Sequence, residues 1–156
     1  MPLRQTQTKH SGFTPLAEIV CINPEHVKLV WPAASHFIKR VYERGVADDA
    51  FEDIEAKLFD GSSLLWLYLD TVVKAACVTE LVFSGRKKLC IVLAAGADEC
   101  DWNAAIKPIE EYAKEEGCEA VRMYGRKGWR RIFKDYDEAW VALEKRLNNG
   151  QIKSDN

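Results

Sequence analysis

The stretch that decides the fold is LLWLYLDTVVKAACVTELVFSGRKKLCIVLAA, residues 64–95. It contains three runs rich in apolar and β-branched residues: 64–69, 72–83 and 89–95. The runs are separated by the turn residues Asp70-Thr71 and Ser84-Gly85, a spacing typical of adjacent antiparallel strands. The sequence therefore predicts a three-stranded meander. Its last strand is apolar at consecutive positions, which indicates a central strand covered on both faces.

A strand and a helix are predicted before this meander. Leu16–Ile22 is a short β-branched run, and the Asn23-Pro24-Glu25 that follows it supplies an N-cap, a proline for the first helical position and an early acid. The apolar residues of the predicted helix recur at three- and four-residue spacing: Val27, Val30, Trp31, Ala34, Phe37, Ile38, Val41 and Tyr42. We expect Pro32 to kink this helix or to restart it at Trp31, and Gly45 to end it.

A second, shorter helix is predicted directly after the first. Asp48 and Asp49 are expected to cap it, and residues 60–63 are expected to end it. Its apolar stripe consists of Ala50, Phe51, Ile54, Leu58 and Phe59.

After the meander the pattern alternates between helix and strand. Asp101 is a good N-cap for a helix that ends at Gly117, with apolar positions at Trp102, Ala105, Ile106, Ile109, Tyr112 and Ala113. Three further elements are predicted: a strand over Ala120–Tyr124, a short basic helix over Trp129–Tyr136 and a last strand over Ala139–Leu143. Together these elements predict an α/β (α+β) fold, with a central mixed sheet that is mostly an antiparallel meander and helices on both faces.

The composition is that of one globular domain, with 47% hydrophobic and 29% charged residues in a chain of 156. We expect residues 1–12 to be a flexible arm, residues 13–147 to form the single domain and residues 148–156 to be a frayed tail. The formal net charge of −2 gives no overall attraction to nucleic acid or to anionic membrane. No apolar run has the length of a membrane span or a signal peptide, so we expect a soluble, cytoplasmic protein with no membrane partner.

The residue types that bind metals or act as nucleophiles form no recognisable motif. The five cysteines are widely spaced and lack a C-x-x-C pair, so we expect reduced core thiols and no metal: Cys21, Cys77, Cys90, Cys100 and Cys118. The three histidines do not form a ligand set: His10, His26 and His36. There is no G-x-S-x-G and no phosphate-binding P-loop, which excludes the common hydrolase and NTPase types.

The order of the predicted elements is similar to that of the GNAT acyltransferase fold over residues 13–147. The stretch EAVRMYGRKGWRRIF, residues 119–133, followed by a closing strand and LEKRL at residues 143–147, resembles the C-terminal half of GNAT-like proteins that tailed bacteriophages encode. Further short matches to that group are Val30-Trp31-Pro32, Leu65-Trp66, Val78-Thr79-Glu80 and Gly117-Cys118. The resemblance implies a GNAT-like fold and a location in the host-cell cytoplasm or in the virion.

The resemblance also implies where acetyl-CoA would bind. Active members carry R/Q-x-x-G-x-G/A between the fourth strand and the next helix, because free backbone N–H groups at a helix N-terminus must hold the pyrophosphate. The corresponding stretch is Gly96-Ala97-Asp98-Glu99-Cys100-Asp101, which has one glycine and three carboxylates. Gly96 and Ala97 are the positions left to hold the cofactor, while each carboxylate would repel the pyrophosphate by about 1 kcal/mol per close charge pair. We therefore expect no cofactor, or acetyl-CoA if the chain is an acyltransferase.

Two residues are candidates for acid–base chemistry in the acyltransferase interpretation. Glu80, in the meander, is the candidate general base. The tyrosine that serves as the family's usual general acid corresponds most nearly to Phe133, and Tyr136 takes that role only if the register shifts by three residues. The more common structural role for Glu80 is that of an exposed or salt-bridged strand glutamate.

Two charged surfaces are candidates for interaction. Residues 122–134 contain six cations, no acid and three aromatic residues, with Arg126, Lys127, Arg130 and Arg131 as the candidate patch. The favoured interpretation is a solvated helix face with Trp129 and Phe133 turned into the core, since they are four residues apart. An acidic patch opposes it: Asp48, Asp49, Glu52, Asp53, Glu55 and Asp60. Head-to-tail contact between copies is one use of two such surfaces.

Three functional hypotheses remain open at this point. The leading one is a phage-associated GNAT-fold protein that is a non-catalytic binding or virion-associated component, with a protein partner or self-association. The alternative is an acetyl-CoA-dependent N-acyltransferase with a divergent pyrophosphate loop, using Glu80 and Tyr136. A weaker alternative is a nucleic-acid contact protein, for which we expect weak binding or none.

Overall fold

The computed structural model describes residues 18–44, 49–125, 128–139 and 141–147. A five-stranded sheet forms the centre of the molecule, with strands in the order β1-β2-β3-β4-β5. The strands are β1 (Glu18–Cys21), β2 (Leu64–Asp70), β3 (Val72–Ser84), β4 (Lys87–Ala97) and β5 (Ala120–Met123). Neighbouring strands are antiparallel, except that β5 runs parallel to β4. The predicted mixed sheet with an antiparallel meander is therefore confirmed.

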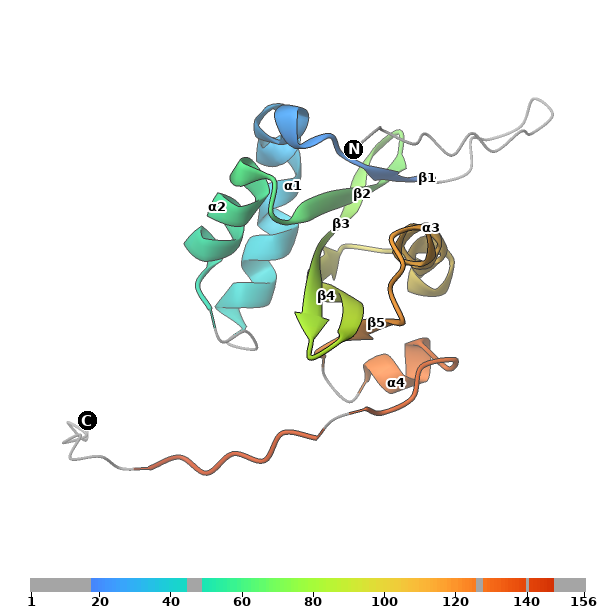
Figure 1. The fold of residues 1–156 in the computed structure, drawn as a ribbon. Coiled ribbons are helices and arrows are strands. Elements are labelled where there is room, and N and C mark those ends of the chain that lie inside the picture. Colours follow the sequence, from blue (N-terminus) through green and yellow to red (C-terminus); the bar gives the residue numbers. More distant parts are fainter. Residues whose placement is uncertain (1–17, 45–48, 126–127, 140, 148–156) are drawn as a thin grey trace, which may run out of the picture.

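Helices cover both faces of this sheet (Figure 1). A 3-10 turn, η1 (Pro24–His26), leads into α1 (Val27–Glu43), and α1 packs with α2 (Phe51–Asp60) on one face. The other face carries α3 (Trp102–Glu115) and the single turn α4 (Trp129–Ile132). Each face has its own apolar core, so the sheet is buried on both sides as the apolar β4 sequence predicts.

Strand β4 contains a bulge that changes which face of the sheet its side chains occupy. Val78 of β3 pairs with Ala94, but the next residue, Thr79, pairs with Val92, so Leu93 is the extra residue on β4. The bulge reverses the side-chain alternation of β4. Val92 therefore packs in the core beneath α3, whereas Ala94 packs in the core beneath α1.

The helix boundaries follow their local caps. The side chain of Asn23 accepts a hydrogen bond from the Glu25 N–H, which begins the first helical turn. Pro32 lies inside α1, which runs through it without interruption, so the predicted restart at Trp31 is wrong. Ala50 occupies the N-cap position of α2 in place of Asp49, and its N–H donates to the Asp53 carboxylate at 3.0 Å. The predicted cap Asp48 and the predicted end of α1 at Gly45 lie outside the described residues.

The C-terminal elements differ from the prediction. The helix predicted over Trp129–Tyr136 ends at Ile132, because Phe133 turns into the core and leaves helical geometry. The closing strand predicted over Ala139–Leu143 does not form: residues 139 and 141–147 have no regular structure, and Val141 and Leu143 are 69% and 93% exposed. An alternating pattern makes a strand only where a neighbouring edge pairs with it, and the described part of this segment runs away from the sheet (Figure 1). The expected arm 1–12 and tail 148–156 lie outside the described residues.

Candidate functional site

Strands β4 and β5, the last two in the sheet order, separate partway along β4. Their parallel ladder covers four pairs, from Leu89↔Ala120 to Val92↔Met123. Strand β4 then continues to Ala97, and over the described residues no strand pairs with its β5-facing edge beyond Val92. The bulge at Leu93 lies at the point of separation. This separation leaves a backbone edge and leads into the loop of residues 96–101.

Gly96, predicted to hold a cofactor, has a structural reason to be glycine. A Cβ built on Gly96 would lie 3.0 Å from the carbonyl carbon of Phe37 and closer still to its oxygen. Both are backbone atoms of α1, so no side-chain rotation relieves the contact. The glycine therefore lets α1 approach β4 closely. Ala97, the second predicted cofactor residue, pairs with Ala75 of β3 as the last residue of β4.

The three carboxylates of the loop have distinct positions. Asp98 Oδ1 lies 3.0 Å from Arg40 Nη2 of α1, so this acid ties the loop to the helix. Asp101 is the N-cap of α3 and accepts a hydrogen bond from Ala104 N at 3.4 Å. Glu99 is exposed. The backbone N–H groups at the start of α3 thus already have a carboxylate beside them, which weakens their attraction for an anion.

A shallow polar cavity of about 290 Å³ lies beside this loop. Its lining contains three carboxylates, one ammonium group, a phenol and a thiol: Asp70, Glu99, Asp101, Lys74, Tyr68 and Cys100. Burial, assisted by the negative charge of Asp101, raises the pKa of the Cys100 thiol to about 12. The thiol is therefore protonated at neutral pH and is a poor nucleophile. The cavity has the charge of a site for a cation and not for a phosphate.

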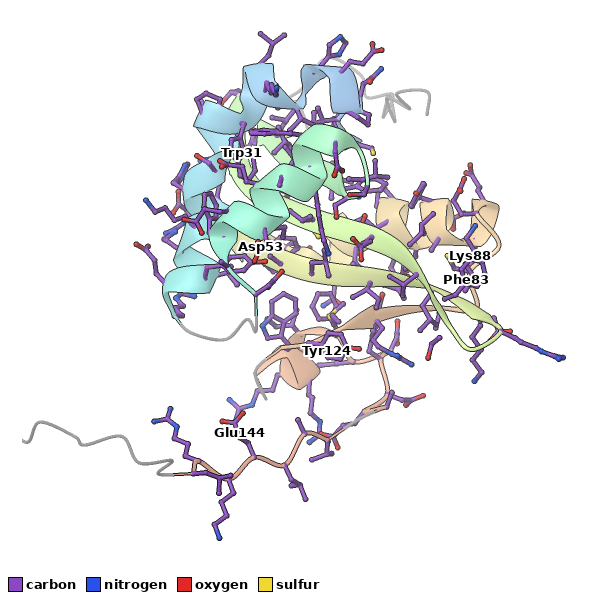
Figure 2. The ribbon with its side chains drawn as sticks, turned by 60° about the vertical axis from the view of Figure 1, so that its left-hand side comes forward. Trp31, Asp53, Phe83, Lys88, Tyr124 and Glu144 are labelled. Atoms are coloured by element: carbon purple, nitrogen blue, oxygen red, sulfur yellow. The ribbon has the colours of Figure 1, made fainter. Side chains whose placement is uncertain are left out.

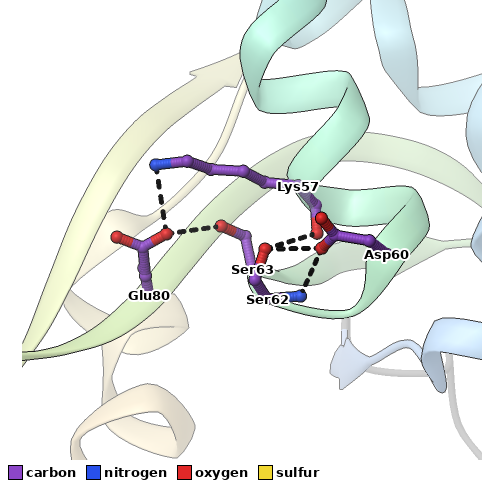
Figure 3. A network of polar contacts seen from close by, with 5 residues as sticks. All are labelled: Lys57, Asp60, Ser62, Ser63 and Glu80. Carbon is purple, nitrogen blue, oxygen red and sulfur yellow. Dashed lines mark hydrogen bonds and ion pairs between the residues drawn. The ribbon is translucent and has the colours of Figure 1, made fainter.

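Glu80, the candidate base, is held in a network on the α2 side of the sheet (Figure 3). Its Oε1 atom lies 3.2 Å from Lys57 Nζ and accepts a hydrogen bond from Ser63 Oγ, also at 3.2 Å. Ser63 is 1% exposed, so this network supports the turn between α2 and β2. The arrangement corresponds to the structural role considered for Glu80, since its carboxylate is engaged by Lys57 and Ser63.

Tyr136, the candidate acid, lies on the opposite side. Its hydroxyl donates a hydrogen bond to Glu110 Oε2 of α3 at 2.7 Å, and its ring packs against Phe133 at 5.4 Å between centroids. Burial, together with the Glu110 carboxylate that accepts this hydrogen bond, raises the pKa of Tyr136 far above its ordinary value. The proton is held between two protein side chains. Phe133, the position expected from the resemblance to match the acid tyrosine, is 2% exposed and has no proton to give.

The structure does not bring Glu80 and Tyr136 together. On β3, Ala76 and Val78 face the core beneath α1, and Glu80 continues the same alternation toward α2. Tyr136 packs in the core beneath α3. The sheet therefore separates the two groups, and they do not form an acid–base pair across one substrate in this conformation.

The basic segment is built around an aromatic stack. Trp129 packs against Phe133 at 5.3 Å and against Trp102 of α3 at 6.3 Å between ring centroids, so the predicted inward orientation of Trp129 and Phe133 is confirmed. Arg130 is exposed and lies 3.6 Å from Glu138, and Arg131 is exposed. Arg126 and Lys127 lie outside the described residues. The described part of the candidate patch is one exposed helical turn.

Sequence reasoning missed several pairings that determine this region. The Arg40–Asp98 ion pair joins residues 58 positions apart, and the Tyr136–Glu110 hydrogen bond joins residues 26 apart. Neither pair has a local signal in the sequence. A third feature missed in the sequence is Gly125, where a Cβ would lie 3.0 Å from the Trp129 ring.

No protein-family model matches the sequence, and no curated protein matches it. Solved structures do match. A GCN5-related N-acetyltransferase from Ralstonia eutropha JMP134 is 14% identical over 84% of this chain and 98% of its own, with a TM-score of 0.60. A predicted acetyltransferase from Clostridium acetobutylicum, solved with acetyl-CoA, is 9% identical over 83% and 96%, with a TM-score of 0.57. An aminoglycoside acetyltransferase from an uncultured soil sample, solved with sisomicin, is 13% identical over 85% and 97%, with a TM-score of 0.60.

These matches concern the fold, since the identities are low while the alignments cover nearly the whole of each partner. No helix in the described ranges is long and apolar enough to cross a membrane. The chain has the fold of the GNAT acetyltransferases.

Proposed function

We propose that this GNAT-fold chain is a protein-binding component that does not use acetyl-CoA in the usual way. The loop of residues 96–101 carries the proposal. Its glycine is required by the backbone of α1, and its Asp98 is paired with Arg40. Its Asp101 caps the helix whose free N–H groups would otherwise receive a pyrophosphate. In GNAT enzymes of known mechanism, a loop of this position has to present several free N–H groups to that anion.

The remaining groups support the same conclusion. The candidate base is ion-paired on one face of the sheet, and the candidate acid is hydrogen-bonded on the other. The resemblance of residues 119–133 to phage-encoded GNAT-like proteins is what suggests a virion component as the partner. Exposed charge on α2 and α4 gives this chain surfaces for such contacts without a pocket for a nucleotide.

An N-acyltransferase is the second candidate, and one observation favours it. Beyond Val92 the edge of β4 lacks a partner strand within the described part of the chain, and the bulge at Leu93 turns its backbone at the same point. A free strand edge binds extended amide-containing molecules such as the arm of CoA by backbone hydrogen bonds. The structural neighbours described as acetyltransferases favour this candidate more than they favour a binding role.

Calorimetric titration of acetyl-CoA and of CoA into the purified chain separates the two candidates. For a binding component we expect no saturation below about 1 mM, which corresponds to only ~4 kcal/mol of association free energy. A dissociation constant in the micromolar range would refute the non-enzymatic proposal. The matched control is the double variant Asp98→Asn with Glu99→Gly, which removes two negative charges beside the start of α3.

The control variant also tests the electrostatic argument itself. If the carboxylates are what prevents binding, the double variant binds CoA more tightly than the parent chain does. If the parent chain binds and the double variant binds more weakly, the acids hold the cofactor in another pose and the acyltransferase candidate replaces the first. In that case Tyr136→Phe is expected to lower turnover, because it removes the proton of the candidate acid.

A further inference from the structure

Strand β5 is an open edge of the sheet. It is the last strand in the sheet order, and β4 is the strand that pairs with it among the described residues. Its Val121 and Met123 face the core beneath α3, and Arg122 between them faces the other side. An edge with unpaired backbone groups and apolar side chains is a template for another strand.

The segment of residues 141–147 has the sequence of such a strand and lies unpaired. Val141, Leu143 and Leu147 are 69%, 93% and 67% exposed. They alternate with Ala142, Glu144 and Arg146, so an extended segment places Val141, Leu143 and Leu147 on one face together with Lys145, and Glu144 and Arg146 on the other. Three apolar side chains this exposed within seven residues indicate a surface that another chain covers.

Val141 and Leu143 of this segment match the apolar face of β5, which carries Val121 and Met123. In any pairing that places Val141 and Leu143 on the α3 side, beside Val121 and Met123, Glu144 lies on the same side as Arg122. The opposite charges of Glu144 and Arg122 favour this arrangement across neighbouring strands. A slip by one residue would expose the apolar side chains again, so the pattern specifies the face.

We propose that two copies of this chain exchange residues 141–147, each adding the segment as a sixth strand to the β5 edge of the other. Each copy offers the β5 edge and one unpaired segment, so a two-fold dimer satisfies both at once. The proposal does not depend on whether the chain binds CoA. It also differs from head-to-tail contact between the acidic and basic helices, because backbone pairing and apolar burial hold it together.

The direction of residues 141–147 favours pairing with β5 of a second copy over pairing with β5 of the same chain. Glu138 is held 3.6 Å from Arg130, and Tyr136 is held by Glu110. From these contacts the described part of the segment runs outward from α4 and away from the sheet (Figures 1 and 2), and Glu144 lies well clear of the strands in Figure 2. The apolar side chains are thus presented to a neighbouring molecule.

Light scattering coupled to gel filtration tests the proposal on the full chain. We expect a mass of about twice 17.7 kDa that persists at high salt, since apolar pairing is not screened. The double variant Val141→Asp with Leu143→Asp is expected to be monomeric, with a dimer dissociation constant raised about a hundredfold or more. Leu29→Asp is the matched control, because Leu29 is 80% exposed on α1, and it is expected to remain dimeric.

Three outcomes would overturn the proposal. The first is a monomeric parent chain. If the double variant then also melts at a lower temperature than the parent chain, residues 141–147 pair with β5 of the same chain. The second is a dimer that survives the double variant. The third is a dimer that dissociates at high salt, which assigns the contact to the charged helices. Because Val141 and Leu143 are exposed in the isolated chain, the double variant itself is expected to fold, and its circular dichroism spectrum checks this.

Discussion

The substitution Gly96→Ala tests whether this glycine serves the fold. The added methyl carbon would lie 3.0 Å from the carbonyl carbon of Phe37, whereas ordinary carbon contacts are about 3.5–4.0 Å. The oxygen of the same carbonyl would lie closer still, so strand β4 or helix α1 must move by about 1 Å at this point. The helix has no room to move, because Ala34, Phe37 and Ile38 are at most 1% exposed. Overpacking costs about 1–3 kcal/mol, and we expect the upper end of that range.

Urea unfolding followed by circular dichroism measures this effect. A loss of about 3 kcal/mol lowers the urea midpoint by roughly 1–2 M for a domain of this size. The matched control is Gly128→Ala, because Gly128 has a φ of −60° and nothing within 4 Å of its added Cβ. We expect the control to be neutral or to stabilise by about 0.4–1 kcal/mol. A Gly96→Ala protein within about 0.5 kcal/mol of the parent chain would refute the close-approach argument and return Gly96 to a cofactor role.

Three more predictions concern the cores. Thr79→Val leaves the buried Trp66 indole N–H without the Thr79 hydroxyl that accepts its hydrogen bond at 2.9 Å. We expect this to lower the free energy of unfolding, measured in urea, by about 1–3 kcal/mol. A double-mutant cycle with Trp66→Phe that shows no coupling would contradict this expectation. Burial raises the pKa of Cys90 from 9.0 to about 12. The contribution of this buried, protonated thiol to the free energy of unfolding is therefore complete below pH 9 and is lost as the pH rises toward 12. Cys90→Ala should therefore flatten the alkaline fall in unfolding free energy by up to about 1.4 kcal/mol per pH unit, and an unchanged slope would refute the assignment. Trp129→Ala is expected to lower the stability measured by thermal melting by about 3 kcal/mol. Arg131→Glu, on the exposed side of the same turn, is expected to change stability by less than about 0.5 kcal/mol. Equal effects of the two substitutions would mean that the aromatic stack is not part of the core.

The sequence predicted the elements whose signals are local. The turn at Ser84-Gly85 and the alternation on either side of it predict the β3–β4 hairpin, and Asp101 predicts the start of α3. The start of β2 at Leu64 follows from the change of periodicity after residues 60–63. These signals act over a few residues, so they do not depend on the rest of the fold.

What the sequence did not predict depends on contacts between distant residues. The closing strand over Ala139–Leu143 has the correct alternation, but whether it pairs depends on an available edge, which the pattern does not contain. The proposed pairing of Glu80 with Tyr136 ignored which face of the sheet each occupies. The face of Glu80 follows from the alternation along β3, whereas that of Tyr136 depends on how α4 packs beneath α3.

The bulge at Leu93 has a consequence for how the protein comes apart. Strands β1 to β4 each give side chains to both cores, and at the bulge β4 passes from Val92 in one core to Ala94 in the other. If either the α1–α2 layer or the α3 layer separated from the sheet, side chains of β4 would be exposed. The other layer packs against the opposite face of the same strand. The amides of β4 on both sides of the bulge are therefore expected to exchange with solvent only when the whole domain opens, as one cooperative unit.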